Sequence, residues 1–540
     1  MSHLQRLWQR FASKMNPPVF LGSAAVVIAF VAFGTIFTRT AHGTFDAVQS
    51  FIVDKFGWFY IMSASVLLLF VLWLLVSRFG RIRLGGEGAE PEFGLLSWFS
   101  MMMAAGMGIG IVFFGVREPL WHFTEPPPPA SQFGAPRSDE ALRTAMRFTF
   151  YHWGLHPWAI YSALALPLAY FHFRHKLPLA PRSLLYPLIG DRIHGWPGHV
   201  VDVMCTVGTL FGVATSLGLG AIQINTGLAE LTGAPETTWF RVALIAGITA
   251  IATVSVVSGI HVGVRRLSEF NIGLAGLILV FVLVAGPTLY VVQLFVSSIG
   301  HYLQNLPSMS FWINPDPDSQ WQADWTLFYW SWWISWSPFV GVFVARISKG
   351  RTIREFIIAA FLVPTLMGFF WFSVIGGTGL HMELSGQADI AKAIHEADSR
   401  AGALYAVLGA LPAAKVMWGA ATLLIVVFFI TSSDSGSLVD DMVTSGGHPN
   451  PPKAQRVFWA CSEGAVAITL LVAGAGALGE TAGLKALRWA SLTTGLPMAA
   501  FLLVASVGLV RALRVDYRTE GLPEVEALAG DAEDEEESRG

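Results

Sequence analysis

Long apolar stretches recur along the whole chain and are separated by short polar segments. A helix needs roughly 20 mostly apolar residues to cross a bilayer, and twelve stretches are long enough. Their approximate limits are 19–38, 57–77, 94–115, 147–172, 200–231, 240–260, 267–297, 324–346, 356–378, 414–437, 456–477 and 484–512. The pattern predicts an all-α integral membrane protein whose twelve transmembrane helices occupy residues 17–514.

Positive charge is unevenly distributed over the polar segments. If both ends of the chain are cytoplasmic, the inner segments hold 22 of the 34 lysine and arginine residues. Because such residues concentrate on the cytoplasmic side of membrane proteins, both termini are expected there. Residues 1–16 are interpreted as a basic cytoplasmic arm rather than a cleaved signal, and residues 515–540 as an acidic cytoplasmic tail.

Composition excludes several classes of protein. Only 13% of the residues are charged, about half the share in soluble domains, and a net charge of −3 gives no reason to expect a nucleic-acid partner. The two cysteines, Cys205 and Cys461, exclude a disulfide framework and a thiolate metal cluster. No span offers a Ser/His/Asp set or paired carboxylates, so an enzyme is not expected.

Residues 324–336, in the eighth span, contain five tryptophans. Tryptophan has the best π face for a cation that cannot donate a hydrogen bond. On an ideal helix Trp332, Trp333 and Trp336 share an arc of about 100°, whereas Trp330 points to the other side. An interfacial aromatic belt is the alternative, but it would place tryptophans near the span ends. The segment therefore predicts a site for a quaternary ammonium group.

The fourth span contains a second aromatic set, Trp153, Trp158 and Tyr161, within an arc of about 140°. These residues are predicted to form further walls of the same site. His152 and His156 are four residues apart, which is a metal-ligand spacing. No acidic third ligand lies in this span, so a zinc site is not expected and the histidines are interpreted as structural or near the outer mouth.

Two further stretches suggest an anion and a sodium site. In residues 104–110 glycines occupy alternate positions, each costing a helix about 1 kcal/mol relative to alanine. This predicts either close helix packing or an unwound segment whose N–H groups face an anion and whose C=O groups face a cation.

In the tenth span the hydroxyls of Thr431 and Ser432 offer oxygen ligands for sodium, although such hydroxyls also bond back to their own helix. Asp434 is a carboxylate within or near the membrane and thus a functional candidate.

Together these four stretches resemble the betaine/carnitine/choline transporter family, over roughly residues 15–515. The Asp324–Trp333 stretch and its continuation Ser337-Pro338-Phe339-Val340-Gly341 match the family signature closely. The resemblance implies the leucine-transporter-type fold, with inverted five-helix repeats in spans 3–7 (about 94–297) and 8–12 (about 324–512). It also implies a homotrimer in the bacterial inner membrane.

The resemblance also implies roles for individual residues. The aromatic box would consist of Trp153, Trp158, Tyr161 and Trp333, with Trp332 and Trp336 nearby, and the substrate would also meet Ala105, Gly106, Gly108 and Gly110. One sodium site would use Ala104, Met107, Phe428, Thr431 and Ser432. A second would use Thr209 and Phe339, but the remaining ligand position is Val213, which cannot bind sodium.

The expected function is secondary active import of a quaternary-ammonium osmolyte, glycine betaine, by sodium symport, without an organic cofactor. Proton-coupled choline carriers that the chain resembles tend to have an aspartate where this chain has Gly110, which favours a zwitterion. Alternatives are a proton-coupled or exchange carrier of choline, carnitine or dimethylsulfoniopropionate, and a transport-inactive osmolyte sensor. Arg117 has no assigned role beyond attracting an anionic group in the outer vestibule.

Overall fold

The computed structural model describes residues 15–519 except 87, 107, 259–260, 317, 396–400, 449–450 and 479–482. Within this part the chain is helical, and the β contact present is an isolated bridge between Arg83 and Thr352. The predicted all-α class is therefore confirmed for the described residues. Residues 1–14 of the predicted arm, residues 520–540 of the predicted tail and the predicted sodium ligand Met107 lie outside the described residues.

Nine helical stretches of the described chain are long and apolar enough to cross a bilayer. They correspond to predicted spans 1, 2, 5–7 and 9–12. Eight of them are the single helices α2 (Pro17–Ile36), α3 (Thr38–Val76), α10 (Trp196–Thr232), α11 (Thr238–Ser258), α12 (His261–Ala285), α20 (Ala414–Thr444), α21 (Lys453–Leu478) and α22 (Gly483–Thr519). The ninth stretch, predicted span 9, consists of α15 (Ile353–Ile357), α16 (Val363–Trp371) and α17 (Gly377–Ser385), joined by the π-helical turns η5 (Ile358–Leu362) and η6 (Phe372–Gly376).

Two predicted limits differ from the helix ends by more than ten residues. The second span was expected to begin at residue 57, but α3 begins at Thr38. The seventh span was expected to continue to residue 297, but α12 ends at Ala285 and a separate helix, α13 (Thr288–Ser310), follows. Pro287 has no N–H to donate to the preceding turn, which favours a helix end at this position. The hydrophobic pattern runs through this position and does not reveal the break.

The other three predicted spans are not single long apolar helices. The third consists of α4 (Leu95–Gly106) and α5 (Ile109–Thr124), the fourth of α7 (Asp139–Trp153) and α8 (Leu155–His175), and the eighth of a π-helical turn, η4 (Ala323–Leu327), and the tryptophan-rich α14 (Phe328–Ile347). Gly108 and Gly154 both have non-helical backbone angles. The glycine run in the third span therefore interrupts the helix, as one of the two interpretations of the sequence predicted.

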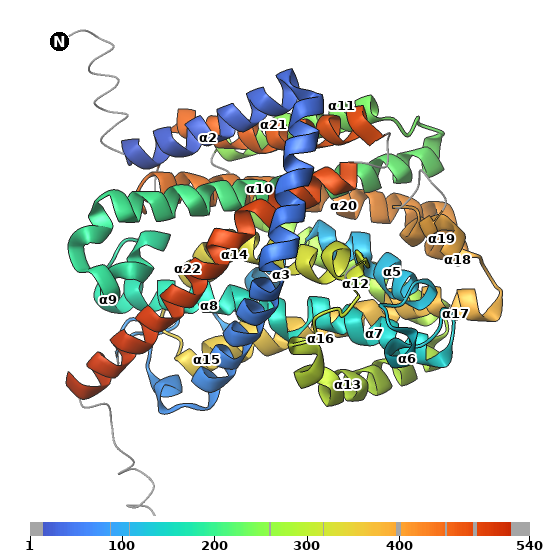
Figure 1. Ribbon diagram of the computed structural model, residues 1–540, viewed down its shortest axis with the longest axis horizontal. Helices are drawn as coiled ribbons and strands as arrows, with labels where there is room; N and C mark the ends of the chain where they lie inside the picture. The colour runs from blue at the N-terminus through green and yellow to red at the C-terminus, as the bar shows by residue number, and fades with distance from the viewer. Residues whose placement is uncertain are drawn as a thin grey trace, which may run out of the picture.

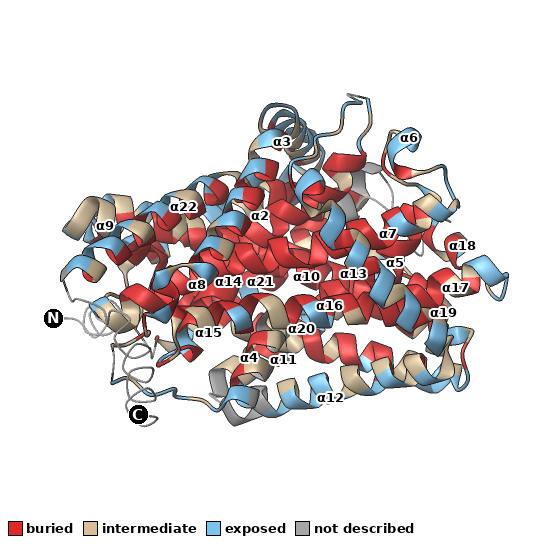
Figure 2. Cartoon of the chain, turned by 90° about the horizontal axis from the view of Figure 1, so that it is seen from below, coloured by how far each residue is buried: buried red, intermediate tan, exposed pale blue. Residues whose placement is uncertain are grey.

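The long helices form a bundle whose long axis is horizontal in Figure 1. Helices α10 and α20 run roughly along this axis, while α3 and α22 cross the bundle obliquely. Short helices cap the ends, with α9 (Tyr186–Ile189) on the left and α18 (Ile390–His395) and α19 (Ala403–Gly409) on the right. The start of α2 and the end of α22 lie at the same, left end of the bundle in Figures 1 and 2.

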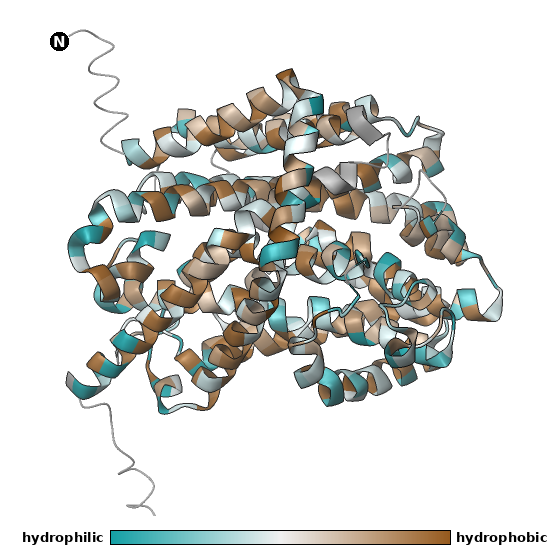
Figure 3. Ribbon diagram, viewed as in Figure 1, coloured by the Kyte–Doolittle hydropathy of each residue, from teal (hydrophilic) through white to brown (hydrophobic). Residues whose placement is uncertain are grey.

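Burial and hydropathy follow this arrangement. Buried residues concentrate in the middle of the bundle, around α8, α10 and α14 (Figure 2), and α14 packs against α8, α10 and α22. Hydrophobic residues cover the bodies of the long helices, whereas hydrophilic residues gather toward the two ends (Figure 3). A polar site in this molecule must therefore be built between the central helices.

A buried ion pair fixes the connection that leads into α10. The Arg182 guanidinium, on the short helix η2 (Pro181–Leu185), donates from Nε to Asp202 Oδ2 at 2.5 Å, and the Arg182 backbone N–H donates to Oδ1 at 2.9 Å. The two side chains are 5% and 0% exposed. Removing one member of such a pair leaves an uncompensated buried charge.

We predict that Asp202→Ala destabilises the detergent-solubilised protein by about 3–5 kcal/mol. Thermal or denaturant unfolding measures this change. The matched control is Glu92→Ala, because Glu92 and Arg346 form a surface ion pair at 3.1 Å with side chains 38% and 51% exposed. An exposed pair contributes at most about 1 kcal/mol. Equal losses in the two variants would contradict the structural role of the Arg182–Asp202 pair.

Candidate functional site

Four aromatic side chains from two segments of the chain come together in the middle of the bundle. Trp153 ends α7, Trp158 and Tyr161 lie in the first two turns of α8, and Trp333 comes from α14. The ring centroids are 4.9 Å apart for Trp153 and Trp333, 5.5 Å for Trp158 and Tyr161, and 6.3 Å for Tyr161 and Trp333. All four side chains are between 4% and 8% exposed. These four residues are called the aromatic box below.

The break between α7 and α8 gives the box its shape. A Cβ atom on Gly154 would lie 2.4 Å from the carbonyl oxygen of Phe150 and 2.6 Å from the ring of Phe369, so a larger residue does not fit there. The interruption turns Trp153 away from the helical register of Trp158 and Tyr161.

The other tryptophans of α14 divide as the helical periodicity predicted. Trp332 stacks on Trp333 at 4.7 Å, and Trp336 meets Trp332 edge-on at 6.2 Å. Trp336 also packs against α10, since a Cβ on Gly212 would lie 3.3 Å from its ring. Trp330 points to the other side, where it contacts Tyr151 and His156. Trp332 thus packs against Trp333 of the aromatic box, and Trp336 lies one turn farther along the helix.

The interrupted glycine stretch lies directly beside these rings. A Cβ on Gly106 would lie 2.2 Å from the ring of Trp158, and one on Gly110 would lie 2.7 Å from Trp332 and 3.0 Å from Trp153. The absence of side chains at these positions lets the backbone approach the aromatic box closely. Of the remaining predicted contacts, the side chains of Ala104 and Ala105 lie outside the described part of the structure.

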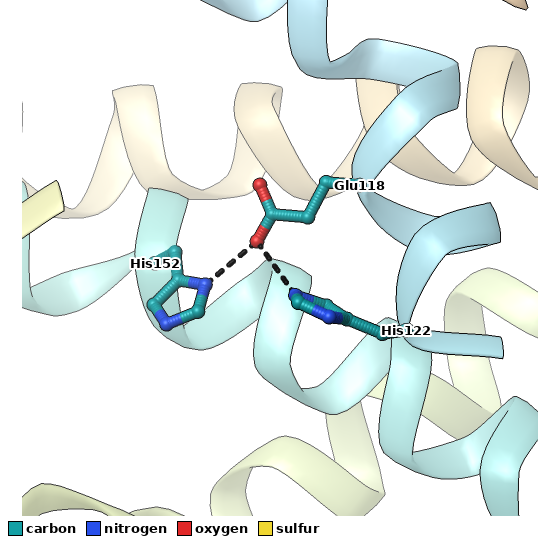
Figure 4. Close-up of side chains that lie close together, drawn as sticks. All are labelled: Glu118, His122 and His152. Atoms are coloured by element: carbon teal, nitrogen blue, oxygen red, sulfur yellow. Dashed lines mark hydrogen bonds and ion pairs between the residues drawn. The ribbon is translucent and has the colours of Figure 1, made fainter. Parts of the chain in front are cut away.

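A buried carboxylate behind the aromatic box was not predicted. Glu118, on α5, is completely buried; its Oε2 accepts hydrogen bonds from Trp153 Nε1 at 2.7 Å and from the Tyr329 hydroxyl at 2.5 Å. His152 Nδ1 lies 2.7 Å from Oε1, and His122 Nε2 lies 3.4 Å from the same oxygen (Figure 4). One carboxylate therefore links α5, α7 and α14 and fixes the orientation of the Trp153 indole.

The acidic neighbour of His152 does not lie in the same span, where an acidic third ligand is absent. His152 and His156 do not act together, because His156 hydrogen-bonds Ser310 at 3.2 Å and stacks on Trp330. The acidic neighbour of His152 is Glu118, from another helix. Glu118, His122 and His152 lie within the mutual distances of metal ligands, but both Glu118 oxygens already engage protein donors. Glu118 Oε1 joins the three residues through its hydrogen bond with His152 at 2.7 Å and its contact with His122 Nε2 at 3.4 Å. The one signal in the sequence was the spacing of Glu118 and His122, which are four residues apart on one helix face.

One predicted sodium ligand of α20, Ser432, lies beside the helix break. A Cβ on Gly108 would lie 3.6 Å from Ser432 Oγ. The Thr431 hydroxyl donates back to the carbonyl oxygens of Val427 at 2.9 Å and Phe428 at 3.2 Å, which is the alternative that the sequence left open. At the second predicted site, the buried Thr209 hydroxyl has no hydrogen-bond partner in the described chain, and Phe339 and Val213 are also buried. The assignment of these residues to sodium stays a prediction.

Arg117 lies against aromatic rings. It is 2% exposed, and its guanidinium carbon is 5.5–6.0 Å from the ring centroids of Phe113, Phe114, Trp121 and Trp325. Phe114 in turn contacts Trp153 and Tyr329. Arg117 is therefore one ring removed from the aromatic box rather than part of it.

Comparison with known proteins gives a consistent result. Residues 18–518 match the model of the betaine/carnitine/choline family transporters. A glycine betaine/proline/choline transporter of Vibrio parahaemolyticus is 42% identical over 526 residues, covering 94% of this chain and 92% of its own length. The glycine betaine transporter OpuD of Bacillus subtilis is 41% identical over 502 residues, 93% of this chain and 95% of its own. An uncharacterized transporter of Mycobacterium tuberculosis is 43% identical over 505 residues, 93% of this chain and 83% of its own.

We predict that Glu118→Ala destabilises the protein, because Trp153, Tyr329 and His152 lose a common acceptor. Each buried group left without a partner costs about 1–3 kcal/mol. Thermal unfolding in detergent measures the loss, and near-ultraviolet circular dichroism reports the loosened tryptophans. Glu118→Gln is the matched control, because it keeps one acceptor oxygen and should lie between wild type and Glu118→Ala. Wild-type stability in Glu118→Ala would show that this network does not hold the helices together.

Proposed function

The chain belongs to the betaine/carnitine/choline family of transporters, and we propose that it imports glycine betaine, a quaternary-ammonium osmolyte, by symport with sodium. The observation that carries the proposal is the aromatic box. A trimethylammonium group has no N–H to donate, so a site selects it through π faces and exclusion of water. Trp153, Trp158, Tyr161 and Trp333 supply such faces in a nearly buried position. Relatives named for glycine betaine transport support this choice of substrate.

The glycine stretch supports a zwitterionic substrate. Its backbone approaches the aromatic box at Gly106 and Gly110, where N–H groups freed by the helix break are suited to receive a carboxylate. Gly110 offers no fixed anion to a purely cationic substrate. The Glu118 carboxylate is engaged behind the Trp153 indole by its own donors. A compound with both a quaternary ammonium and a carboxylate matches this combination better than choline does.

Sodium coupling is proposed through the segment where α20 meets the helix break. Ser432 lies beside Gly108, so hydroxyls of α20 and carbonyls of the interrupted helix offer the oxygen ligands that a hard cation prefers. The ligands would be Ala104, Met107, Phe428, Thr431 and Ser432. Thr209 and Phe339 would form a second site, which Val213 deprives of one ligand.

The proposed transporter has twelve spans and two inverted repeats, spans 3–7 and 8–12. The broken helices α4/α5 and the tryptophan-rich α14 would be the first helices of the two repeats, which matches the rule that paired irregular helices mark the binding site. We further propose a homotrimer in the bacterial inner membrane with both termini cytoplasmic. The common position of the two described chain ends supports this orientation.

One observation favours a variant of this function. Val213 removes an oxygen from the second predicted sodium site, which would suit coupling to fewer sodium ions or to protons. A relative named for glycine betaine, proline and choline also suggests a broader substrate range. The second candidate is therefore a proton-coupled carrier or an exchanger of choline, carnitine or a sulfonium analogue.

We expect purified protein in proteoliposomes to accumulate labelled glycine betaine above equilibrium under an inward sodium gradient. Replacing sodium by potassium should abolish accumulation, because potassium does not fit oxygen ligands placed for the smaller ion. Accumulation driven instead by a proton gradient would establish the second candidate. Binding without accumulation under either gradient would identify a sensor rather than a transporter.

We predict that Trp333→Ala weakens glycine betaine binding roughly 30-fold while the protein still inserts, because a desolvated cation–π contact is worth about 2 kcal/mol. Trp153→Ala should act similarly. Isothermal titration calorimetry on detergent-solubilised protein measures the affinity. Trp330→Phe is the matched control, since Trp330 lies on the other face of α14 and its replacement should leave the affinity unchanged. Unchanged affinity in both alanine variants would refute the aromatic-box assignment.

A further inference from the structure

A second polar cluster lies between α20 and α21, away from the aromatic box. Glu463, on α21, is completely buried and receives two hydrogen bonds from α20. The Ser433 hydroxyl donates to Oε2 at 2.7 Å and the Ser437 hydroxyl donates to Oε1 at 3.1 Å. The two serines are four residues apart and hence neighbours on one helix face. Two hydroxyls and a carboxylate thus meet in the apolar interior of the bundle.

Asp440 adds a second carboxylate to this cluster. It follows Ser433 by seven residues, which places it within about 20° of Ser433 around the helix. It is completely buried, and neither of its carboxylate oxygens has a hydrogen-bond partner in the described chain. Asp440 also lies close enough to Glu463 for the two negative charges to repel each other. A buried carboxylate without a hydrogen-bond partner in the described chain therefore lies near Glu463, on the helix face that carries the two serines.

Glu463 and Asp440 differ from two other buried carboxylates of the bundle, which are paired with arginine. Arg182 pairs with Asp202 and Arg456 lies 3.7 Å from Asp441, whereas Asp434 accepts a hydrogen bond from Ser255 at 2.8 Å. Across residues 15–519, leaving out the undescribed positions, Glu463 and Asp440 form no ion pair. Uncompensated carboxylates are strongly unfavourable inside a membrane protein, and they mark ion pathways by default.

The cluster lies next to the position where the second predicted sodium site lacks a ligand. A Cβ on Gly436 would lie 2.9 Å from Glu463 Oε1 and 2.8 Å from a methyl carbon of Val213. Gly436 therefore lets α20 approach both Glu463 and Val213 closely. On this side α10 contributes an apolar wall, and the oxygen atoms come from α20 and α21.

We propose that Glu463, Asp440, Ser433 and Ser437 bind a sodium ion between α20 and α21. A small hard cation prefers carboxylate and hydroxyl oxygens, and a hydroxyl that donates its hydrogen still offers lone pairs. The bound ion balances the two carboxylates, which form no ion pair within the described chain. The inference rests on the sodium coupling proposed above. It places the second ion here, apart from the Thr431 and Ser432 site, instead of at Thr209 and Phe339, where Val213 removes a ligand.

The test is binding of radioactive sodium to the purified full-length protein in detergent, without substrate. The wild type should bind two sodium ions per chain. Glu463→Gln keeps the side-chain shape and an acceptor for the serines but removes the charge, so it should bind one. Ser432→Ala should also bind one, and the double variant none. Glu92→Gln, which neutralises an exposed carboxylate, is the matched control and should retain both ions.

Asp440→Asn provides an independent variant should Glu463→Gln fail to fold, and it should weaken one of the two sodium sites roughly tenfold or more. Wild-type sodium stoichiometry and affinity in the folded variants would overturn the inference. A wild type with a single site that Ser432→Ala removes and Glu463→Gln keeps would also overturn it. Because the assay contains no substrate, two bound sodium ions without glycine betaine uptake would contradict the proposed function and leave this site standing.

Discussion

The structure depends on one constraint: backbone polar groups inside a membrane must find partners within the protein. Helices satisfy this requirement along their length, so an interruption is tolerated only where other side chains enclose it. Both glycine breaks meet this condition. Gly154 is covered by Phe369, and Gly108 faces Ser432 of α20. The same enclosure keeps water from the aromatic rings next to the breaks, so the structural requirement and the proposed binding chemistry favour the same place.

The Glu118 carboxylate extends this principle from backbone to side chains. A buried charge is unfavourable unless several donors reach it, and here Trp153, Tyr329 and His152 do so from two other helices. Each donor gains an acceptor that the apolar interior does not otherwise provide. The arrangement makes the orientation of the Trp153 indole depend on the relative positions of α5, α7 and α14. A movement of one of these helices would therefore change the aromatic box directly.

Much of the fold could be predicted from the sequence, because an apolar run of about 20 residues has few alternatives in a membrane protein. The limits of α2, α11 and α21 differ from the prediction by only a few residues. Helical periodicity also separated Trp330 from Trp332 and Trp333 correctly. The break at Gly154 and the end of α12 at Ala285 were missed, because both lie inside mostly apolar stretches that are long enough to be interpreted as single spans.

The site was predictable where its residues share a helix and unpredictable where they do not. The four aromatic-box residues carry strong local signals, and the structure brings them together. Glu118 and Glu463 meet their partners across 34 and 30 residues of sequence, and no local pattern encodes such a contact. The sodium ligands stay predictions, since hydroxyls such as that of Thr431 bond equally well to their own helix.

The common position of the two chain ends has a consequence for topology. A chain that starts and finishes on one side of a membrane must cross it an even number of times. The nine stretches that qualify by length and apolarity among the described residues are odd in number. If both ends lie on one side, as proposed above, a crossing beyond these nine would make the number even, and the interrupted and tryptophan-rich segments can supply it. The proposed orientation thus gives a reason, independent of hydropathy, to place a crossing in the segments that carry the aromatic rings and the broken helices.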